Sequence, residues 1–147
     1  MIAMLKTLSV LSFFGMVGGL AALIGNHMLF SSSPPVIVAQ ILAVLLMVWA
    51  RVVFGRRSFH AAANPTEGEL VTVGPYRFIR HPLYAAVCLF AVAGVATHRS
   101  WTAEALCGLI LVGALVRLRC EEVLLATRFP QYHAYTAKTW RMIPYVF

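Results

Sequence analysis

Residues 68–84 read GELVTVGPYRFIRHPLY, and this stretch lies between two long apolar segments of the chain. It gathers turn formers, cations and aromatic residues, and a His81-Pro82 step stands near its end. Proline suits the first position of a helix, because its missing N–H group would have no partner there. The stretch therefore predicts a loop that leads into a helix at Pro82.

The start of that helix has the features of an anion site. The first turn of a helix offers free N–H groups and the positive end of the helix dipole, and Arg80 and His81 stand directly before it. A plainer interpretation is a juxtamembrane loop whose Arg and Tyr residues only anchor the helix. Spacing alone favours neither interpretation.

The composition indicates a membrane protein. Of the 147 residues, 61% are hydrophobic and 12% are charged, whereas soluble domains are about half apolar and about a quarter charged. The net charge is +7, and eleven of the twelve Lys and Arg residues fall in three clusters on one side of the predicted topology. This is the positive-inside pattern, so the charge reports orientation and contact with the lipid bilayer, and no nucleic acid is expected as a partner.

Four membrane spans are expected, at about residues 7–30, 36–54, 82–97 and 101–118. A helix needs roughly 20 residues to cross a bilayer. The third span is shorter than this, so its ends are expected in the interface. Nothing ends the last helix at Leu118, and it can continue to Phe129, before Pro130. Both termini and the connection between the second and third spans then lie in the cytoplasm, and Arg99 faces outward.

The predicted fold is an all-α integral membrane bundle, with a C-terminal helical hairpin and a cytosolic cofactor pocket. We expect a single domain over residues 1–147, with two N-terminal spans in 1–57 and a core in 58–147. The expected location is a cell membrane, as a multi-pass protein of the prokaryotic inner-membrane type. Gly15 and Gly19 permit close helix packing, which favours contact within the monomer and leaves a homodimer open.

The histidines and cysteines give no metal signal. The five histidines do not cluster, and the three cysteines form no Cys-x-x-Cys pair. No metal site is therefore expected. Two of the cysteines fall inside apolar spans, where they are expected to act as small hydrophobic residues.

A second polar group lies at the end of the fourth span. Arg117 and Glu121 are four residues apart and share a helix face, and Glu122 points about 100° away. A solvated ion pair is the plain interpretation, worth only about 0.3–0.5 kcal/mol. Ionisable groups at the edge of a membrane bundle, however, usually face its interior or a water-filled cavity. If the third and fourth spans form a hairpin, these groups meet the Arg80–Tyr84 turn at one depth.

Several short motifs follow one another along the C-terminal half of the chain. They are Gly74-Pro75-Tyr76-Arg77, Arg80-His81-Pro82-x-Tyr84, Arg117-x-x-x-Glu121-Glu122, Phe129-Pro130-x-Tyr132-x-x-Tyr135 and Arg141-x-Ile143-Pro144. Together they resemble the isoprenylcysteine carboxyl methyltransferase family, membrane enzymes related to phospholipid N-methyltransferases. The resemblance covers roughly residues 68–147. Two features depart from that family: the eukaryotic enzymes have more membrane helices, and Ala86 stands where glycine is frequent.

The resemblance implies S-adenosylmethionine as the methyl donor and S-adenosylhomocysteine as the product. It implies a catalytic pair, Arg117 and Glu121, in which Arg117 also holds the acceptor. The cofactor site that it implies comprises a strand-like stretch, Glu69, Leu70 and Val71, that contacts the cofactor through its backbone, together with Tyr76, Arg80, His81, Pro82, Leu83, Tyr84 and Glu121. The chemistry of S-adenosylmethionine agrees with this set of residues. Its carboxylate needs cations or N–H groups, and its ammonium needs a carboxylate. Its adenine and its sulfonium suit aromatic faces.

The predicted function is methyl transfer to a lipophilic small molecule or a lipidated acceptor at the cytosolic membrane face. A carboxylate acceptor needs no general base and only a positioning cation such as Arg117. A thiol or amine needs a proton removed, with Glu121, Glu122 or His133 as candidates. The acceptor atom stays open.

Two rival functions remain. A sterol-reductase-like membrane enzyme would bind NADPH, but the carboxylates of Glu121 and Glu122 would repel its phosphates. A non-catalytic membrane ligand-binding protein would keep the fold alone. A soluble methyltransferase with a glycine-rich loop on a parallel sheet does not fit the composition, and no such loop occurs in the sequence.

Overall fold

The computed structural model describes residues 2–55 and 70–147. Their helices are α1 (Ile2–Gly25), α2 (Pro34–Phe54), the short 3₁₀ helix η2 (Gly74–Arg77), α3 (Pro82–Val95), α4 (Trp101–Arg128) and α5 (Tyr132–Thr136). Apart from one isolated bridge between Ile79 and Trp140, these residues form no β-structure. The all-α prediction is therefore confirmed for the part of the chain that the structure describes.

The helix boundaries follow the turn chemistry of the sequence. Pro82 takes the first position of α3, with His81 directly before it, as predicted. α4 continues past Leu118 and ends at Arg128, as the absence of a stop signal predicted. α1 covers Ile2–Gly25, whereas the apolar run covers 7–30. The helix ends early because the chain leaves it after Gly25, and His27 takes a positive φ of 56°.

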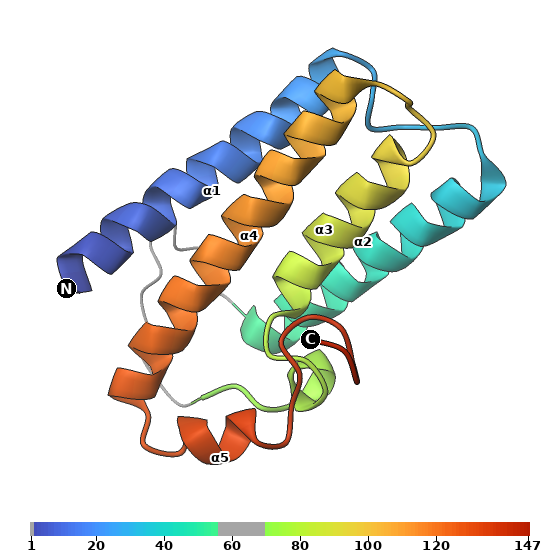
Figure 1. Ribbon diagram of the computed structural model, residues 1–147. Helices are drawn as coiled ribbons and strands as arrows, with labels where there is room; N and C mark the ends of the chain where they lie inside the picture. The colour runs from blue at the N-terminus through green and yellow to red at the C-terminus, as the bar shows by residue number, and fades with distance from the viewer. Residues whose placement is uncertain (1, 56–69) are drawn as a thin grey trace.

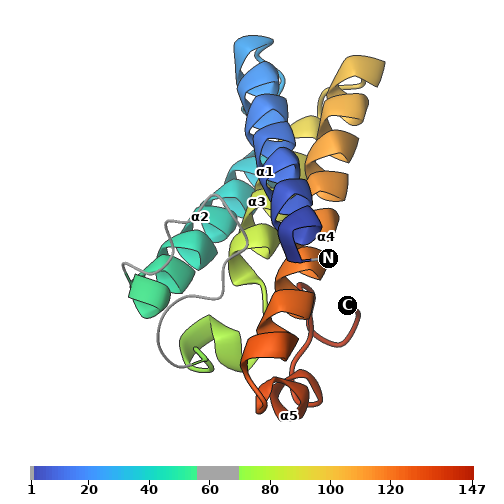
Figure 2. The ribbon, with the colours of Figure 1, turned by 90° about the vertical axis from the view of Figure 1, so that its left-hand side faces the viewer.

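The four long helices run alternately up and down the bundle. Figure 1 shows α1 lying along α4 and α3 standing between α4 and α2, and the pairs α1–α4, α2–α3 and α3–α4 are in contact. The predicted hairpin of α3 and α4 is therefore present. Figure 2 shows that α4 extends past the start of α1 and that α5 lies beyond this end of the bundle. Both chain ends lie toward the same end (Figure 1).

The cations gather at that end of the bundle. Among the described Lys and Arg residues, only Arg99 lies in the connection at the opposite end. The others stand in the first half of α1, the end of α2, η2, the turn before α3, the second half of α4 or the segment after α5. The charge asymmetry read from the sequence is thus an asymmetry of the folded bundle as well.

The outer faces of the bundle are apolar. Within the described residues, α1 and α2 are long and apolar enough to cross a membrane, and α3 is apolar but has only 14 residues. Both long helices leave large hydrophobic side chains exposed, including Leu11, Phe14, Ile41, Leu45 and Trp49. Large apolar side chains exposed along two long helices are costly in water and suited to lipid.

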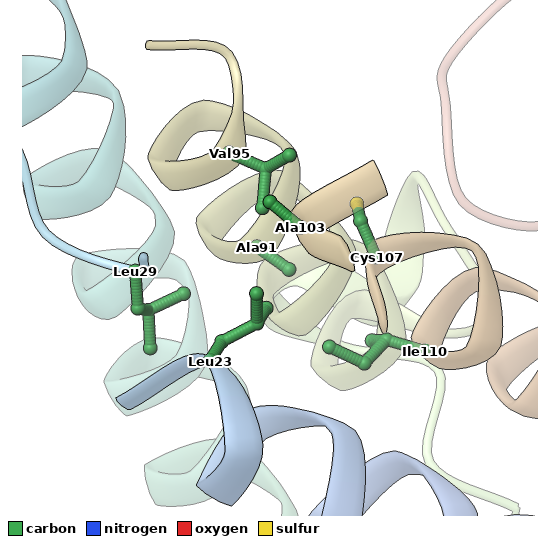
Figure 3. Packing of buried hydrophobic residues seen from close by; sticks show 7 residues of the cluster. All are labelled: Leu23, Leu29, Ala91, Val95, Ala103, Cys107 and Ile110. Carbon is green, nitrogen blue, oxygen red and sulfur yellow. The ribbon is translucent and has the colours of Figure 1, made fainter. Parts of the chain in front are cut away.

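The core forms where α1, the α1–α2 connection, α3 and α4 meet. Its seven buried members are shown in Figure 3: Leu23, Leu29, Ala91, Val95, Ala103, Cys107 and Ile110. Small residues permit this packing, since a Cβ atom on Gly19 would lie 2.9 Å from Ile110 Cγ1. The glycine pair therefore serves contact within the monomer, as predicted. Cys88, Cys107 and Cys120 are all free and buried.

Candidate functional site

The candidate site begins at the turn before α3, which the C-terminal segment holds in place. The backbone N–H of Arg80 donates to Trp140 O over 2.7 Å, and that of His81 donates to Arg141 O over 2.9 Å. Trp140 returns a bond to Phe78 O over 3.1 Å. These bonds form a short parallel pairing between two segments sixty residues apart, and they fix the backbone that carries Arg80 and His81.

Arg80 and Glu122 form the central ion pair of this region. Arg80 Nε lies 3.1 Å from Glu122 Oε1, and both side chains are largely buried. Arg80 also donates to the carbonyls of Thr136, at the end of α5, and of Thr139, beyond it. On the other side of the carboxylate, Arg141 Nε lies 3.0 Å from Glu122 Oε2. One carboxylate on α4 thus joins the start of α3 to the C-terminal segment.

This environment keeps Glu122 ionised. Burial opposes its charge, but the nearby His81 and Arg141 outweigh burial and lower the pKa of the carboxyl from 4.5 to about 2. A group of this kind is a permanent anion at neutral pH. It is suited to holding cations in place and is a poor proton acceptor.

His81 lies between two carboxylates. Its Nδ1 is 3.7 Å from Glu121 Oε2, and its Nε2 is 3.7 Å from Glu122 Oε1. Neighbouring residues on a helix point about 100° apart, and this divergence lets the two Glu side chains reach opposite edges of one imidazole. The ring is buried, with a side-chain exposure of 4%, and Nε2 has no hydrogen-bond partner in the described structure.

Tyr84 links the second carboxylate to Arg117. Arg117 Nε donates to the Tyr84 hydroxyl oxygen over 2.6 Å, and that hydroxyl donates to Glu121 Oε1. Arg117 Nε is also 3.5 Å from the same carboxylate oxygen. The Arg117–Glu121 pair is therefore partly buried and shared with a third group, unlike a solvated ion pair on a helix surface. Glu121 has a side-chain exposure of 25%, against 6% for Arg117, so it is the more accessible of the two charges.

Helix α1 completes the surroundings of Arg117. The Arg117 guanidinium donates from Nη1 to Ser9 O over 3.3 Å and lies over the Phe13 ring, at 5.1 Å from the ring centroid. These α1 contacts carried no signal in the sequence, because Ser9 acts through its backbone and Phe13 is one aromatic residue in a long apolar run. The hydroxyl of Ser9 is buried without a partner in the described structure.

A groove lies beside this network. It has a volume of about 420 Å³ and is lined by Leu70, Thr72, Gln131, Ala134, Tyr135 and Lys138. The Tyr135 hydroxyl donates to Tyr76 O over 2.6 Å, so the groove adjoins the η2 turn. Burial raises the pKa of Tyr135 to about 12 although the nearby Arg80 lowers it, so this hydroxyl stays protonated at neutral pH. Small-molecule sites commonly have volumes of about 300–1,000 Å³.

The structure brings most of the predicted site residues to one end of the bundle. Arg80, His81, Tyr84, Arg117 and Glu121 form one connected group, with Glu122 as an additional member. Pro82 and Leu83 belong to the first turn of α3. Tyr76 is buried in η2 and linked to the groove, and Leu70 lines it.

Two predicted features of the site differ from the structure. Leu70 and Val71, expected to be strand-like, belong to no strand, and Glu69 lies outside the described residues. Arg80, expected to offer its charge to an anion, has donors engaged by Glu122, Thr136 and Thr139. Sequence reasoning missed that engagement because two of the three contacts come from backbone carbonyl groups 56 and 59 residues away.

The chain is similar in sequence to a known metal-resistance protein. The nickel-cobalt-cadmium resistance protein NccN of Alcaligenes xylosoxydans xylosoxydans is 41% identical over an alignment of 81 residues, which covers 52% of this chain. The chain spans only 36% of that relative's length. The described residues of the present chain contain no group of three His, Cys, Asp or Glu side chains suited to a metal ion. No solved structure matches the chain.

The comparison with protein families covers more of the chain. The sequence model of the isoprenylcysteine carboxyl methyltransferase family matches residues 29–127, well over half of its length. The matched region contains α2, α3 and nearly all of α4, and with them His81, Tyr84, Arg117 and both carboxylates. The matched region leaves out α1, which contacts Arg117, and the C-terminal segment, whose Arg141 is bonded to Glu122. The chain belongs to the isoprenylcysteine carboxyl methyltransferase family.

Proposed function

We propose that the protein is an integral membrane methyltransferase that uses S-adenosylmethionine and acts on a lipophilic acceptor at the cytosolic membrane face. The observation that carries this proposal is the connected group of Arg80, His81, Tyr84, Arg117 and Glu121 at one end of the bundle. Two turns that are distant in sequence meet there. Family membership supports the reaction class.

The proposed topology has four spans with both termini in the cytoplasm. The gathering of the described cations at one end supports it, because cytoplasmic segments carry an excess of Lys and Arg. In this topology α3 is a short span whose ends lie in the interface. The second half of α4 and α5 lie outside the lipid, on the cytosolic side.

The residues present fit the proposed methyl donor. When bound, S-adenosylmethionine supplies an activated methyl group on a sulfonium sulfur. Glu121 can accept hydrogen bonds from its ammonium or ribose hydroxyls, because this carboxylate is partly exposed. The first-turn N–H groups of Leu83 and Tyr84 have no acceptor within the helix, which suits a carboxylate, since the Arg80 guanidinium is engaged elsewhere. The groove beside Tyr76 has a volume suited to the remainder.

Arg117 is proposed to contact the acceptor from within the bundle. It lies where α1, α3 and α4 meet, at the edge of the apolar region. A lipophilic acceptor approaching through the membrane would reach the network at this point. Positioning and the exclusion of water would then supply much of the rate enhancement.

The rival reductase is distinguished by its ligand. NADPH carries several phosphates, and the site offers two carboxylates, with Arg80 and Arg141 already paired to one of them. The test is to incubate membranes that contain the protein with methyl-labelled S-adenosylmethionine and to measure label in the lipid-soluble fraction. Label that appears with the wild type and is lost with Glu121→Gln supports the proposal. Equal label from wild type, Glu121→Gln and empty membranes contradicts it.

A further inference from the structure

We propose that residues 142–147, which we call the C-terminal loop, are a movable cover over a binding site. The place on the bundle that the Met142 side chain occupies receives the hydrocarbon chain of the acceptor when the loop moves. This proposal rests on the proposed function and adds to it a site for the apolar part of the substrate. Its basis is the attachment of the loop, the surroundings of Met142 and the side chains that the loop exposes.

The C-terminal loop is bonded to itself and not to the helices. The N–H groups of Met142 and Ile143 both donate to Phe147 O over 2.8 Å, and Ile143 O accepts in turn from the N–H of Phe147 over 3.0 Å. Among the described residues, no hydrogen bond joins 142–147 to a helix. The bonds that fix the C-terminal segment end at Arg141. The loop can therefore move about Arg141 without breaking a hydrogen bond to the bundle, as locally opening segments do.

Met142 ties the loop to the bundle through apolar contact. It is half-buried and packs against a cluster that has one buried residue from each of three helices: Met16 of α1, Cys88 of α3 and Ala114 of α4. We call these three residues the Met142 seat. Apolar packing is non-directional, and methionine is an unbranched and flexible side chain. A surface that accepts such a side chain can accept an unbranched hydrocarbon chain in its place.

The Met142 seat adjoins the charged network of the candidate site. Tyr84 packs against the same cluster, and its hydroxyl accepts from Arg117 and donates to Glu121. Cys88 follows Tyr84 by four residues, about one turn of α3. Ala114 precedes Arg117 by three residues, about one turn of α4. A molecule whose reacting group lies at Arg117 would therefore extend its chain along the seat.

The outer side of the C-terminal loop is suited to lipid. Ile143, Tyr145 and Val146 are all exposed, with Tyr145 at 85%. Figure 1 shows the C-terminal segment folding back beside the start of α3. The Met142 seat belongs to helices that are proposed to cross the membrane, and tyrosine is frequent at the membrane–water boundary. An acceptor dissolved in the membrane would therefore meet this loop on its way to Arg117.

The alternative is that Met142 is a fixed part of the core and that the loop stays closed. Two native cysteines separate the alternatives without any turnover. Cys88 belongs to the Met142 seat, whereas Cys107 belongs to the main core, and each is 7% exposed. Opening of the loop would uncover Cys88 and leave Cys107 buried. A closed loop would keep both thiols equally protected.

The experiment uses the full chain in phosphatidylcholine vesicles and N-ethylmaleimide, a thiol reagent that crosses membranes. Mass spectrometry measures the label at Cys88 and at Cys107. Met142→Ala should speed the labelling of Cys88 about 10-fold, because truncation removes the apolar burial that keeps the loop closed. Labelling of Cys107 should not change. Ile143→Ala is the matched control, since Ile143 is exposed in the same loop, and it should match the wild type.

Met142→Leu keeps an apolar side chain of similar volume and should restore slow labelling of Cys88. Equal labelling of Cys88 in the wild type and Met142→Ala would overturn the cover. An equal rise at Cys107 in Met142→Ala would also overturn it, because Met142 would then hold the whole bundle together.

A second measurement tests the occupant of the seat, in the wild type and in Met142→Ala. Dodecanoate should slow the labelling of Cys88 increasingly as its concentration rises, because its chain would lie on the seat. Butanoate has the same head group and a short chain, and it should give no protection. No protection by dodecanoate, or equal protection by both acids, would overturn the site. Binding of S-adenosylmethionine, measured separately by calorimetry, tests the proposed function, and its absence would contradict that function whatever Cys88 shows.

Discussion

Arg80 and Glu122 are forty-two residues apart in sequence, yet Arg80 Nε lies 3.1 Å from Glu122 Oε1. The pair joins the start of α3 to the far half of α4, and Arg80 binds the carbonyl groups of Thr136 and Thr139 as well. Through these contacts one guanidinium fixes three segments. The candidate site therefore depends on Arg80, whose guanidinium is already paired with Glu122 and bonded to backbone carbonyl groups.

Removal of that guanidinium should destabilise the fold. Breaking a buried ion pair typically costs about 3–5 kcal/mol, and we expect Arg80→Ala to cost about 3 kcal/mol, because Glu122 keeps Arg141. The control is Arg77→Ala, since Arg77 is exposed. Chemical unfolding in detergent measures both variants. Equal free energies of unfolding for Arg80→Ala and Arg77→Ala would show that the ion pair contributes nothing.

Glu122 should make stability depend on acidic pH. Its pKa is about 2 in the folded protein and 4.5 as a free side chain, so the folded state binds this proton less readily. The contribution, at most about 3 kcal/mol, is fully present above pH 4.5 and is lost as the pH falls from about 4.5 to about 2. Unfolding midpoints of wild type and Glu122→Gln should therefore converge across that window. A constant difference between them would contradict the lowered pKa.

Gly19 and Gly18 form a matched pair that tests the packing of α1 against α4. A Cβ atom at Gly19 would lie 2.9 Å from Ile110 Cγ1, whereas one at Gly18 would meet nothing within 4 Å. Gly19→Ala should cost about 1–3 kcal/mol through overpacking. Gly18→Ala should be neutral or stabilising by up to about 1 kcal/mol, because alanine favours the helix. Equal effects in thermal unfolding would show that α1 does not pack here as described.

The functions of Glu121 and Arg117 should separate in cofactor binding. Glu121→Gln should weaken binding of S-adenosylmethionine by about 1.5–3 kcal/mol, the usual contribution of a charged hydrogen bond. Arg117→Ala should leave this affinity nearly unchanged and should lower turnover on the acceptor. Isothermal titration of both variants provides the comparison. A wild-type affinity in Glu121→Gln would remove Glu121 from the cofactor site, and a large loss in Arg117→Ala would place Arg117 there.

The four-span topology predicts which positions are open to labelling. Cysteines introduced at Ser32 and Ser100, in the two connections at one end, should react with an impermeant reagent added to intact cells. A cysteine at Lys138, at the other end, should react only after the membrane is opened. The native cysteines are buried, so their background should be low. Labelling of the Lys138 position in intact cells would contradict the orientation.

Much of the fold was predictable because hydrophobic runs and turn residues act locally. Pro82 begins α3 and Pro130 follows the end of α4, and both boundaries depend on backbone chemistry that a sequence displays. The hairpin that joins Tyr84 to Arg117 was also predictable, because short connections make neighbouring helices antiparallel. The early end of α1 was not, since it depends on the left-handed conformation of His27 and on the burial of Leu29 in the core.

The candidate site was predictable only in its membership. Motif spacing brought His81 and Glu121 to one place, but it did not show that Glu122 lies at the other edge of the imidazole. The contact of Arg117 with Ser9 uses a backbone carbonyl, which any residue provides. The bonds from the 78–81 turn to Trp140 and Arg141 are also between backbones. Contacts of this kind carry no residue preference and so leave no trace in a single sequence.

The central claim is that this bundle binds S-adenosylmethionine, and calorimetric titration of the detergent-purified protein tests it most directly. Parallel titrations with S-adenosylmethionine, S-adenosylhomocysteine and NADPH should show saturable binding of the first two and weak or no binding of NADPH. The two carboxylates at the site favour a cationic ligand over one that carries several phosphates. Preferential binding of NADPH, or no binding of S-adenosylmethionine by a folded protein, would contradict the account.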